Sequence, residues 1–410
     1  MSGANRREGP LQRWWVYQDL PTLGLHPVAS LQIRARVLYL LMMRLLLIHP
    51  EAKYFAGAET MLLYFLEGLM SARSEVVVAV ANEGTLSRRI PNRVEQIPIR
   101  DNGAFSIGCL RRQLAGLMGR HRVRPFDVVH GWAARDWELA ALLGKLIRRP
   151  TVGTLHDHPQ ARFISLKRRR LMQWSARWGL DRVVCVSEAV RLACLAASYP
   201  KDKLQVVHNG LPDCSAVRPP RTTAVFRAGF LGAFSERKGL QLLFAIVSEL
   251  SNRTTRPWEL HLAGEAQEDA GRNLVEQIRQ RFGNESWWSK VHWHGWVPEP
   301  LHFLRTLDLL VVPSSEFDPF PTVLLEAGQV GVPVLAANTG GIPEIVVEGQ
   351  TGLLFDPGDP REAAGKVGRL MEEPEILDKM SERAIRKTNH EFSVGKMVAE
   401  YGKVYSTLSN

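Results

Sequence analysis

Cysteine is scarce in this chain of 410 residues. The four cysteines form no Cys-x-x-Cys pair, and no group of histidines stands at metal-ligand spacing along the sequence; the cysteines are Cys109, Cys185, Cys194 and Cys214. A disulfide framework or a structural zinc site is therefore not expected, and a reducing cytoplasm is the compartment that fits best.

Long hydrophobic runs are also missing. The longest extends from Val37 to Ile48 and is interrupted by Arg44, which makes it too short for a membrane span of about 20 apolar residues. No signal-peptide cleavage pattern follows it. We therefore expect a cytoplasmic protein whose contact with a membrane, if it has one, is peripheral and at the inner face.

What the chain does have is length, an ordinary apolar content and a positive charge. Its 410 residues exceed the size of one common core and predict two domains. A hydrophobic content of 45% with 23% charged residues is typical of globular proteins. The net charge of +10 favours partners that carry phosphate, namely nucleic acid, anionic lipid or a nucleotide. A basic protein without such a partner would explain the charge equally well.

Short apolar runs alternate with helical patterns from Met43 onward. The first series of expected strands is Met43–His49, Glu75–Ala81, Asp127–Trp132, Thr151–His156, Arg182–Ser187 and Leu204–His208. The second series is Ala228–Gly232, Glu259–Ala263, Val291–His294, Leu307–Val312 and Val332–Ala336. Apolar strands between helices predict parallel sheets covered on both faces. The fold class is therefore α/β, with two doubly wound Rossmann-like domains that face a cleft.

The domain limits follow from these series. Residues 1–42 combine arginines, tryptophans and prolines in a pattern unlike the rest, and we interpret them as an extension or a misassigned start. The first domain is expected at 43–215 and the second at 216–392. Residues 393–410 include an amphipathic helix, expected over Ser393 to Leu408.

Two acids frame the start of a predicted helix in the second half. Asp318 lies in the loop after a strand, and Glu326 follows eight positions later on the helix that Pro321 is expected to begin. An ionised carboxylate accepts two hydrogen bonds from a vicinal diol, and a nucleotide sugar carries such diols on its ribose and its sugar. The diphosphate between them would meet the positive end of the helix. Acids are common near helix starts, so two surface acids without a ligand are the alternative.

Two further strand-to-helix turns have residues that suit a phosphate. Gly340 and Gly341 follow one predicted strand and would let the backbone approach a ligand. The turn from Gly232 to Gly239 contains Arg237 and Lys238, whose charges could neutralise a departing diphosphate. An ordinary turn and solvated loop charges are the alternatives for each turn taken alone. Three such turns in one predicted domain favour a nucleotide-sugar site.

These motifs together resemble the GT-B glycosyltransferases of the GT4 group, also called glycosyl transferases group 1. The resemblance is close from Leu231 to about Phe392, through the turn at Lys238, the acid pair, the turn Gly340-Gly341-Ile-Pro-Glu344 and the segment from Thr351 to Gly358. The first half is similar more loosely, at Ala56–Glu59, Asp127–His130, Thr154–Asp157, Cys185–Glu188 and Val207–Gly210.

The resemblance implies an enzyme that transfers a sugar with retention, without a metal or other cofactor, from a nucleotide-sugar donor such as a UDP- or GDP-sugar. The acceptor would be a glycan, a lipid-linked molecule or a small molecule. It implies that the second domain binds the donor and the last helix crosses back to the first domain. The implied donor-binding residues are Glu326 for the ribose diol, Asp318 with the backbone around Phe320 and Pro321 for the sugar, and Thr322, Gly232, Gly340 and Gly341. His156 would lie beside the reacting sugar, Lys238 and Arg237 at the diphosphate, and Gly57, Glu59 and His130 on the acceptor side.

Three residues depart from the family pattern. Asp318 stands where a glutamate is usual, and this shorter acid keeps the charge but is expected to alter sugar preference. Ala233 replaces the usual arginine after the phosphate-strand glycine, so Arg237 is expected to compensate. Ala56 replaces the first glycine of the N-terminal loop.

A basic segment in the first half is the other feature with a functional interpretation. Lys167-Arg-Arg-Arg170 runs into Leu171, Trp174 and Trp178, which share one helical face. Such a helix could rest on anionic lipid. A solvated basic face over a packed aromatic stripe is the favoured alternative.

Two other functions stay open at this point. An epimerase or sugar phosphorylase of the same fold would bind a similar ligand but would not transfer the sugar to an added acceptor. A basic protein without catalytic activity would bind polyanions instead, with strong salt dependence; we expect no nucleic-acid partner. The four tryptophans that could form a stacking platform are interpreted more simply as core residues around a strand: Trp287, Trp288, Trp293 and Trp296.

Overall fold

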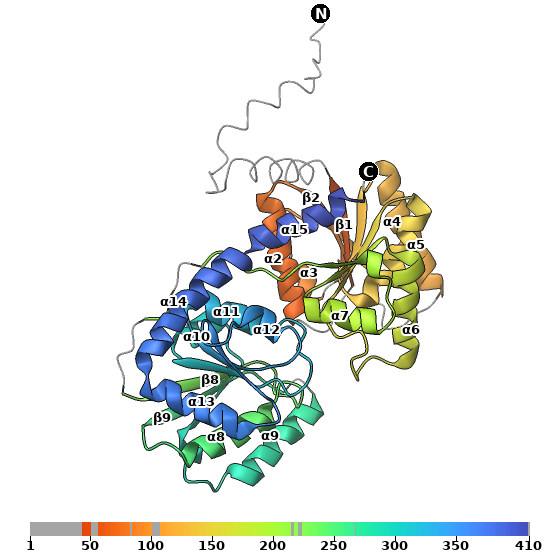
Figure 1. Cartoon of the computed structure of the whole chain (residues 1–410). Helices are drawn as coiled ribbons and strands as arrows, with labels where there is room; N and C mark the ends of the chain where they lie inside the picture. Colours follow the sequence, from red (N-terminus) through yellow and green to blue (C-terminus); the bar gives the residue numbers. More distant parts are fainter. Residues whose placement is uncertain are drawn as a thin grey trace, which may run out of the picture.

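The computed structural model describes residues 43–50, 56–82, 84–100, 107–214, 217–219, 224–266 and 268–408. Within them the chain forms two parallel β-sheets, each with its own set of helices (Figure 1). The predicted α/β class with two Rossmann-like domains is confirmed. The interpretation of residues 1–42 and the boundary between residues 215 and 216 lie outside the described residues.

The first sheet has seven strands in the spatial order β3-β2-β1-β4-β5-β6-β7. Its strands are β1 Arg44–His49, β2 Glu75–Ala81, β3 Glu95–Ile99, β4 Val128–Gly131, β5 Thr151–Leu155, β6 Arg182–Cys185 and β7 Leu204–Val206. Its helices are α2 Gly57–Ser71, α3 Thr85–Arg89, α4 Ile107–Val123, α5 Trp137–Ile147, α6 Leu166–Trp174 and α7 Glu188–Ala196. The four apolar residues from Leu45 to Ile48 are at most 2% exposed, as expected for a central strand covered on both faces.

The second sheet has six strands in the order β10-β9-β8-β11-β12-β13. Its strands are β8 Phe226–Leu231, β9 Trp258–Ala263, β10 Val291–Gly295, β11 Leu309–Val312, β12 Val334–Ala337 and β13 Gly352–Phe355. Its helices are α8 Leu240–Ser251, α9 Asp269–Phe282, α10 Pro300–Arg305, α11 Thr322–Val330, α12 Ile342–Ile345, α13 Pro360–Glu372 and α14 Pro374–Glu391. The predicted apolar face of α8 is confirmed, because all five of its residues are buried: Leu240, Leu243, Phe244, Val247 and Leu250.

Each sheet has one point where the strand order reverses. The chain builds β1, β2 and β3 outward and then returns to place β4 on the other side of β1; β8 and β11 are related in the same way. Loops leave the carboxyl ends of such neighbouring strands in opposite directions and open a crevice between them. The reversal between β8 and β11 places the turn at Lys238 beside the loop that contains Asp318.

Two strands were not predicted, and both lie at a sheet edge. β3 contains Pro98, which an edge strand tolerates because one side of it makes no ladder hydrogen bonds. β13 has only four residues. The helix predicted to begin at Pro321 begins one residue later, so that Pro321 occupies the N-cap position of α11.

The tryptophans near β10 differ from one another in burial. Trp287 is buried, and Trp293 stacks on Phe244 with ring centroids 5.8 Å apart. The core interpretation holds for this pair. It is wrong for Trp296, which is 62% exposed.

The last helix, α15 Val394–Ser406, returns to the first domain and lies beside α2 (Figure 1). The two helices approach closely at Gly68, where a Cβ atom would lie 2.4 Å from Val394 Cγ1. Tyr401 and Tyr405 of α15 are buried in the first domain. No helix among the described residues combines the length and the apolar character that crossing a bilayer requires.

Candidate active site between the two domains

An ion pair marks the strand reversal of the second sheet. Lys238 Nζ donates to Asp318 Oδ2 at 2.8 Å, and Ser314 Oγ donates to the same oxygen at 2.8 Å. Burial alone would raise the pKa of Asp318, but the charge and hydrogen bond of Lys238 and the charge of Arg237 hold it below its usual value. Asp318 is therefore an ionised, buried acid that fixes the ammonium group of Lys238.

Glycines allow the three turns of this site to pack against one another. Gly340 has φ 56°, and a Cβ atom there would lie 2.1 Å from the carbonyl oxygen of Asp318. The amide of Gly341 donates to that carbonyl at 2.8 Å. Gly239, with φ 74°, approaches the carbonyl of Pro313 in the same loop. These glycines bring protein backbone onto the loop of Asp318, and their contact with a ligand stays a prediction.

Glu326 lies on α11, on the side of the second domain that faces the first. Its side chain is partly buried, and burial raises its pKa to about 7 although a hydrogen bond from Thr322 acts in the opposite direction. Burial and the charge of Glu326 together raise the pKa of Tyr64, which belongs to α2 of the first domain. Glu326 is thus close to the other domain and does not lie in the apolar core.

Glu344 of the second domain binds the start of a helix in the first. Its two carboxylate oxygens accept from the backbone amides of Glu188 and Ala189, each at 2.8 Å, at the beginning of α7. Nε2 of His208 donates to the same carboxylate at 3.0 Å. Although burial raises the pKa of Glu344, these three donors lower it overall. An acid at a helix start is stabilised by the helix dipole, so Glu344 ties the domains together.

Phe320 extends this connection from the loop of Asp318. It is buried, and its ring stacks on that of His208 at 5.0 Å with 9° between the planes. Nearby, the rings of His158 and Phe317 meet edge to face at 4.7 Å. Arg162 and Glu316 form an exposed ion pair of 3.4 Å across the same gap. The loop that contains Asp318 therefore packs directly on the first domain.

His156 and Asp157 form the first domain's side of this gap, at the end of β5. Nε2 of His156 donates to the carbonyl of Trp132 at 2.9 Å, which leaves Nδ1 unprotonated. Burial lowers the pKa of His156 to about 4, so the ring is neutral at pH 7. Burial raises the pKa of Asp157, and the charges of Arg237, Asp318 and Lys238 also act on this carboxyl group. Asp157 was not among the predicted site residues, although its position directly after His156 could have indicated it.

Gly232 and Gly57 lie at the borders of the site. Gly232 follows β8, and its amide donates to the carbonyl of Ala263 at 3.0 Å. Gly57 is exposed and is the first residue of α2. Both glycines lie at the border of a turn that a ligand could approach, and the contact of each glycine with a ligand stays a prediction.

Glu59 lies in the interior of the first domain, beneath the gap. It is 4% exposed, and its oxygens accept from His49 Nε2 at 2.9 Å and from the amide of Ala56 at 2.8 Å. Asp136 Oδ2 holds the other ring nitrogen of His49 at 2.8 Å. Burial lowers the pKa of His49, but the two carboxylates raise it overall to about 9. The structure places Glu59 in a buried charge cluster, and its predicted place on the acceptor side stays a prediction.

His130 is likewise placed in the interior. It is fully buried, with Nδ1 2.8 Å from the hydroxyl of Tyr405 and Nε2 2.8 Å from the hydroxyl of Thr154. Burial lowers its pKa to about 3, which keeps the ring neutral. Both ring nitrogens are engaged within the domain, which gives His130 a structural role, and its predicted place on the acceptor side stays a prediction.

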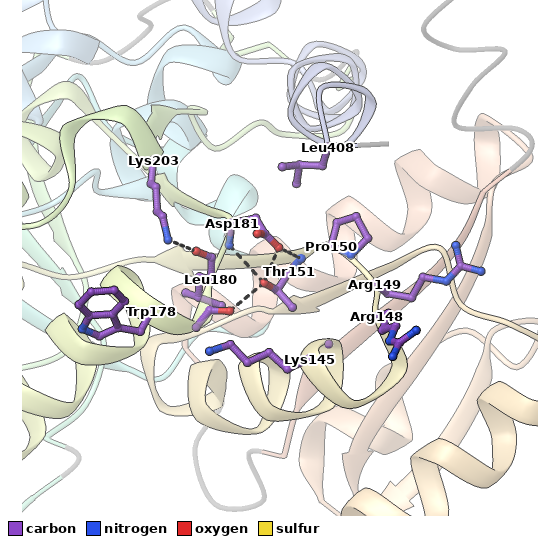
Figure 2. Close-up of a pocket in the computed structure, with 12 residues that line it drawn as sticks. Lys145, Arg148, Arg149, Pro150, Thr151, Trp178, Leu180, Asp181, Lys203 and Leu408 are labelled. Atoms are coloured by element: carbon purple, nitrogen blue, oxygen red, sulfur yellow. Dashed lines mark hydrogen bonds between the residues drawn. The ribbon is translucent and has the colours of Figure 1, made fainter. Parts of the chain in front are cut away.

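The basic aromatic segment of the first domain forms α6 and a following π-turn, Ser175–Gly179. Its aromatic side chains are not packed, because Trp174 is 49% and Trp178 60% exposed. The favoured interpretation of a packed stripe is therefore wrong. Trp178 also borders a cavity of about 380 Å³, whose lining includes Lys145, Arg148 and Arg149 (Figure 2).

Two facing Rossmann-like domains with charged groups at the strand reversal define the GT-B architecture of glycosyltransferases. Comparisons with known proteins agree with it. Residues 55–213 match the family described as Glycosyltransferase Family 4, and residues 223–387 match Glycosyl transferases group 1. The chain is 33% identical over 311 residues to D-inositol 3-phosphate glycosyltransferase of Corynebacterium jeikeium, covering 67% of this chain and 72% of that protein.

More distant relatives extend the likeness. The chain is 26% identical over 295 residues to glycogen synthase of Mycobacterium tuberculosis, covering 69% of each protein. The crystal structure of Anabaena HepE in complex with UDP-glucose has the same fold, with a TM-score of 0.76 and 21% identity, covering 89% of this chain and all of that one. Sucrose-phosphate synthase of Thermosynechococcus elongatus gives a TM-score of 0.70 at 18% identity, covering 89% of this chain and 99% of that one. The chain belongs to the group 1 glycosyltransferases and is an enzyme of that family.

Proposed function

We propose that this enzyme transfers a sugar from a UDP- or GDP-sugar to an acceptor hydroxyl, with retention at the anomeric carbon. The observation that carries this proposal is the ion pair of Lys238 and Asp318 at the strand reversal, with Glu326 on the adjacent α11 facing the first domain. A similar fold binds UDP-glucose in the HepE complex, which supports a nucleotide-sugar donor.

Each charged group of the second domain has a part of the donor to bind. Glu326 accepts from the ribose diol, because a carboxylate presents two acceptor oxygens to two neighbouring hydroxyls. Asp318 holds Lys238 through Oδ2 and accepts from a sugar hydroxyl through Oδ1. Thr322 and the backbone at Phe320 and Pro321 border the same end of α11.

Positive charge at the diphosphate drives the reaction. Lys238 and Arg237 stabilise the negative charge that develops as the bond from the anomeric carbon to the phosphate oxygen breaks. The acceptor oxygen attacks from the face that the diphosphate leaves, and a phosphate oxygen takes the acceptor's proton. Two cations supply the charge that a divalent metal would otherwise provide, so we propose transfer without a metal.

The neutral ring of His156 completes the site from the first domain. Its Nε2 is held by the carbonyl of Trp132, so Nδ1 points an acceptor lone pair away from that contact. We assign Nδ1 to a hydroxyl of the sugar beside the reacting carbon. Asp157 shares the charged environment of Lys238 and Arg237, and we place it on the acceptor side of the same gap.

A panel of UDP-, GDP- and ADP-sugars tests the donor by thermal shift. One donor class is expected to raise the melting temperature of the wild type by about a few degrees, and the Glu326→Ala variant is expected to lose that rise. Glu375→Ala, an exposed acid on α14, is the matched control and should keep it. No shift with any donor would contradict the proposal. Product analysis by NMR would then test retention, because an inverted anomeric centre excludes the proposed attack.

The exposed surface around α6 favours an anionic membrane as the place where this enzyme meets its acceptor. We define the α6 surface by its exposed residues Phe163, Leu166, Lys167, Arg170, Trp174, Arg177 and Trp178. Each cation near anionic headgroups contributes about 1 kcal/mol to membrane binding. Exposed tryptophan rings favour the lipid interface. Lys145 and Arg148 line the cavity next to Trp178 and extend the positive charge (Figure 2).

Vesicle co-sedimentation tests this surface. The protein is expected to bind vesicles that contain phosphatidylglycerol and to bind neutral phosphatidylcholine vesicles weakly. The double variant Trp174→Ser and Trp178→Ser should lose most of the binding, while Trp296→Ser, which removes an exposed tryptophan of the second domain, should not. Equal binding to both kinds of vesicle, or equal binding by the three proteins, would exclude the proposed contact.

A further inference from the structure

A second group of ionisable side chains lies on the second sheet, away from the strand reversal. Glu259 and His261 belong to β9, and His292 belongs to the edge strand β10. One ligand atom from each of the three residues lies within 4.8 Å of the others. The two strands bring together residues that are far apart in sequence, so the cluster is a property of the fold.

The register of the strands explains why these three side chains share one face. His292 and His261 are direct partners across the β9–β10 pair. Glu259 precedes His261 by two residues on β9, and alternate residues of a strand point to the same side of the sheet. Leu260 and Leu262 point to the opposite side and are buried in the core. The position of each donor is therefore fixed by the ladder of the sheet and by the core behind it.

A fourth residue orients the central histidine. The bulge between Trp293 and Gly295 brings Nε2 of His294 to 3.0 Å from Nδ1 of His261. The other nitrogen of His261, Nε2, lies 3.2 Å from Glu259 Oε2, and His292 Nε2 lies 3.8 Å from Glu259 Oε1. Histidines that bind a metal usually have their second ring nitrogen held by a hydrogen bond, which fixes the ring and its tautomer; for His261 the partner is His294.

The donor set and its exposure suit a zinc ion. Zinc is bound by imidazole nitrogen and carboxylate oxygen in sites with three protein ligands and one water. The side chain of His292 is 42% exposed, which leaves a route from solvent. Arg227 of β8 also faces Glu259, with Nε 3.7 Å from Oε2, so the carboxylate would be shared between the metal and this guanidinium.

We propose that Glu259, His261 and His292 form a zinc site in which His294 positions His261. The ion would connect the edge strand β10 to β9 and so stabilise the outer border of the second sheet. Its ligands come from β9 and β10, whereas Lys238 and Asp318 follow β8 and β11. The site is therefore separate from the groups that we assign to sugar transfer.

The test uses the full chain without an affinity tag, stripped of metal with a chelator. Titration with zinc by calorimetry is expected to show one ion bound per chain and a higher melting temperature. Cobalt in place of zinc should give the visible absorption of a four-coordinate ion. His261→Ala and His292→Ala are each expected to abolish the stoichiometric binding. His294→Ala should weaken it about tenfold to a hundredfold, as for other residues that orient a ligand.

His390→Ala, which removes an exposed histidine of α14, is the matched control and should bind zinc as the wild type does. His292 is partly exposed, so its variant keeps the test valid if His261→Ala does not fold. The proposal is overturned if the stripped wild type shows no saturable binding of zinc. It is equally overturned if His292→Ala retains one ion per chain.

Discussion

The two domains use their ionisable side chains in opposite ways. In the second domain Asp318, Lys238 and Glu326 lie at the ends of strands and at the start of a helix, beside the gap between the domains. In the first domain His49 and His130 are completely buried, and each ring is held at both nitrogens. The second domain thus places charged groups beside the gap, where we propose that the donor binds, whereas the first uses buried polar groups to fix its shape. Hydrogen-bonded polar networks of this kind rigidify a domain, although Oδ1 of Asp136 is left without a hydrogen-bond partner in this one.

The largest effect is expected from breaking the ion pair of the second domain. Lys238→Met removes a cation from the departing diphosphate and leaves the buried carboxylate of Asp318 without its ammonium partner. We expect kcat to fall by about a hundredfold to a thousandfold, the usual cost of losing one group that stabilises developing charge. Steady-state kinetics would measure it. Lys366→Met breaks an ion pair of the same 2.8 Å length on α13, and an equal loss there would contradict the assignment.

The buried cluster of His49, Glu59 and Asp136 in the first domain should affect the stability of the protein and not its catalytic turnover. The pKa of His49 is raised to about 9. The protonated ring therefore contributes its full stability to the fold below about pH 6.5, and this contribution is lost as the pH rises through 9. We expect the free energy of unfolding to fall by about 3 kcal/mol between pH 6.5 and pH 10. Urea denaturation at each pH would measure this slope. His49→Gln should be less stable at pH 6.5 and should lack most of the slope; an unchanged slope would exclude His49 as its source.

The bridge between the domains should have an intermediate effect. Glu344→Ala removes a carboxylate that accepts from the start of α7 and from His208. The contact between the two domains would be weakened, and we expect KM for the donor to rise about tenfold while kcat changes less, the equivalent of about one charge-assisted hydrogen bond. The control is Glu188→Ala, whose carboxylate pairs with Arg191 inside α7. If both variants gave the same KM, the bridge would have no part in donor binding.

The smallest expected effect is the change of donor affinity with pH. Burial raises the pKa of Glu326 to about 7, so the carboxylate gains a proton as the pH falls below that value. If the ionised form accepts from the ribose, donor Kd should rise about fivefold between pH 7 and pH 6, because the ionised fraction of Glu326 falls by that factor. Calorimetric titration across this range would show it. Glu326→Gln should bind weakly at every pH, and a variant that kept the pH dependence would point to another group.

The second domain could be predicted from the sequence in more detail than the first. Strand ends, glycine turns and the acid pair follow one another within short segments, so the position of Asp318 beside Lys238 depends only on the order of two neighbouring strands. Glu59 and His130 have chemistry that suits a site equally well. The partner of His130, Tyr405, lies 275 residues further along the chain. The partners of Glu59, which are His49 and the amide of Ala56, are close in sequence, but only the fold shows that this cluster is buried.

The other differences between prediction and structure also arise where a local sequence pattern does not reveal the tertiary surroundings. β3 and β13 are edge strands; β3 contains two polar residues and Pro98, and β13 begins with Gly352, so neither has the uninterrupted apolar run of a central strand. Leu171, Trp174 and Trp178 have a helical spacing that usually marks a packed face, and only the structure shows that their face is uncovered. Glu259 and His292 stand 33 residues apart in sequence, so linear spacing could not join them into one cluster.

The return of α15 to the first domain has a consequence for how the protein is made. Tyr401 and Tyr405 fill the interior beside β4 and β5, where their hydroxyls meet Thr154 and His130. A ribosome delivers the N-terminal half of the chain first, yet that half completes its core only after the helix that ends at Ser406 has emerged. The part synthesised earliest is therefore finished last, and nascent chains that stop before α15 should depend on chaperones to protect the open side of the first sheet.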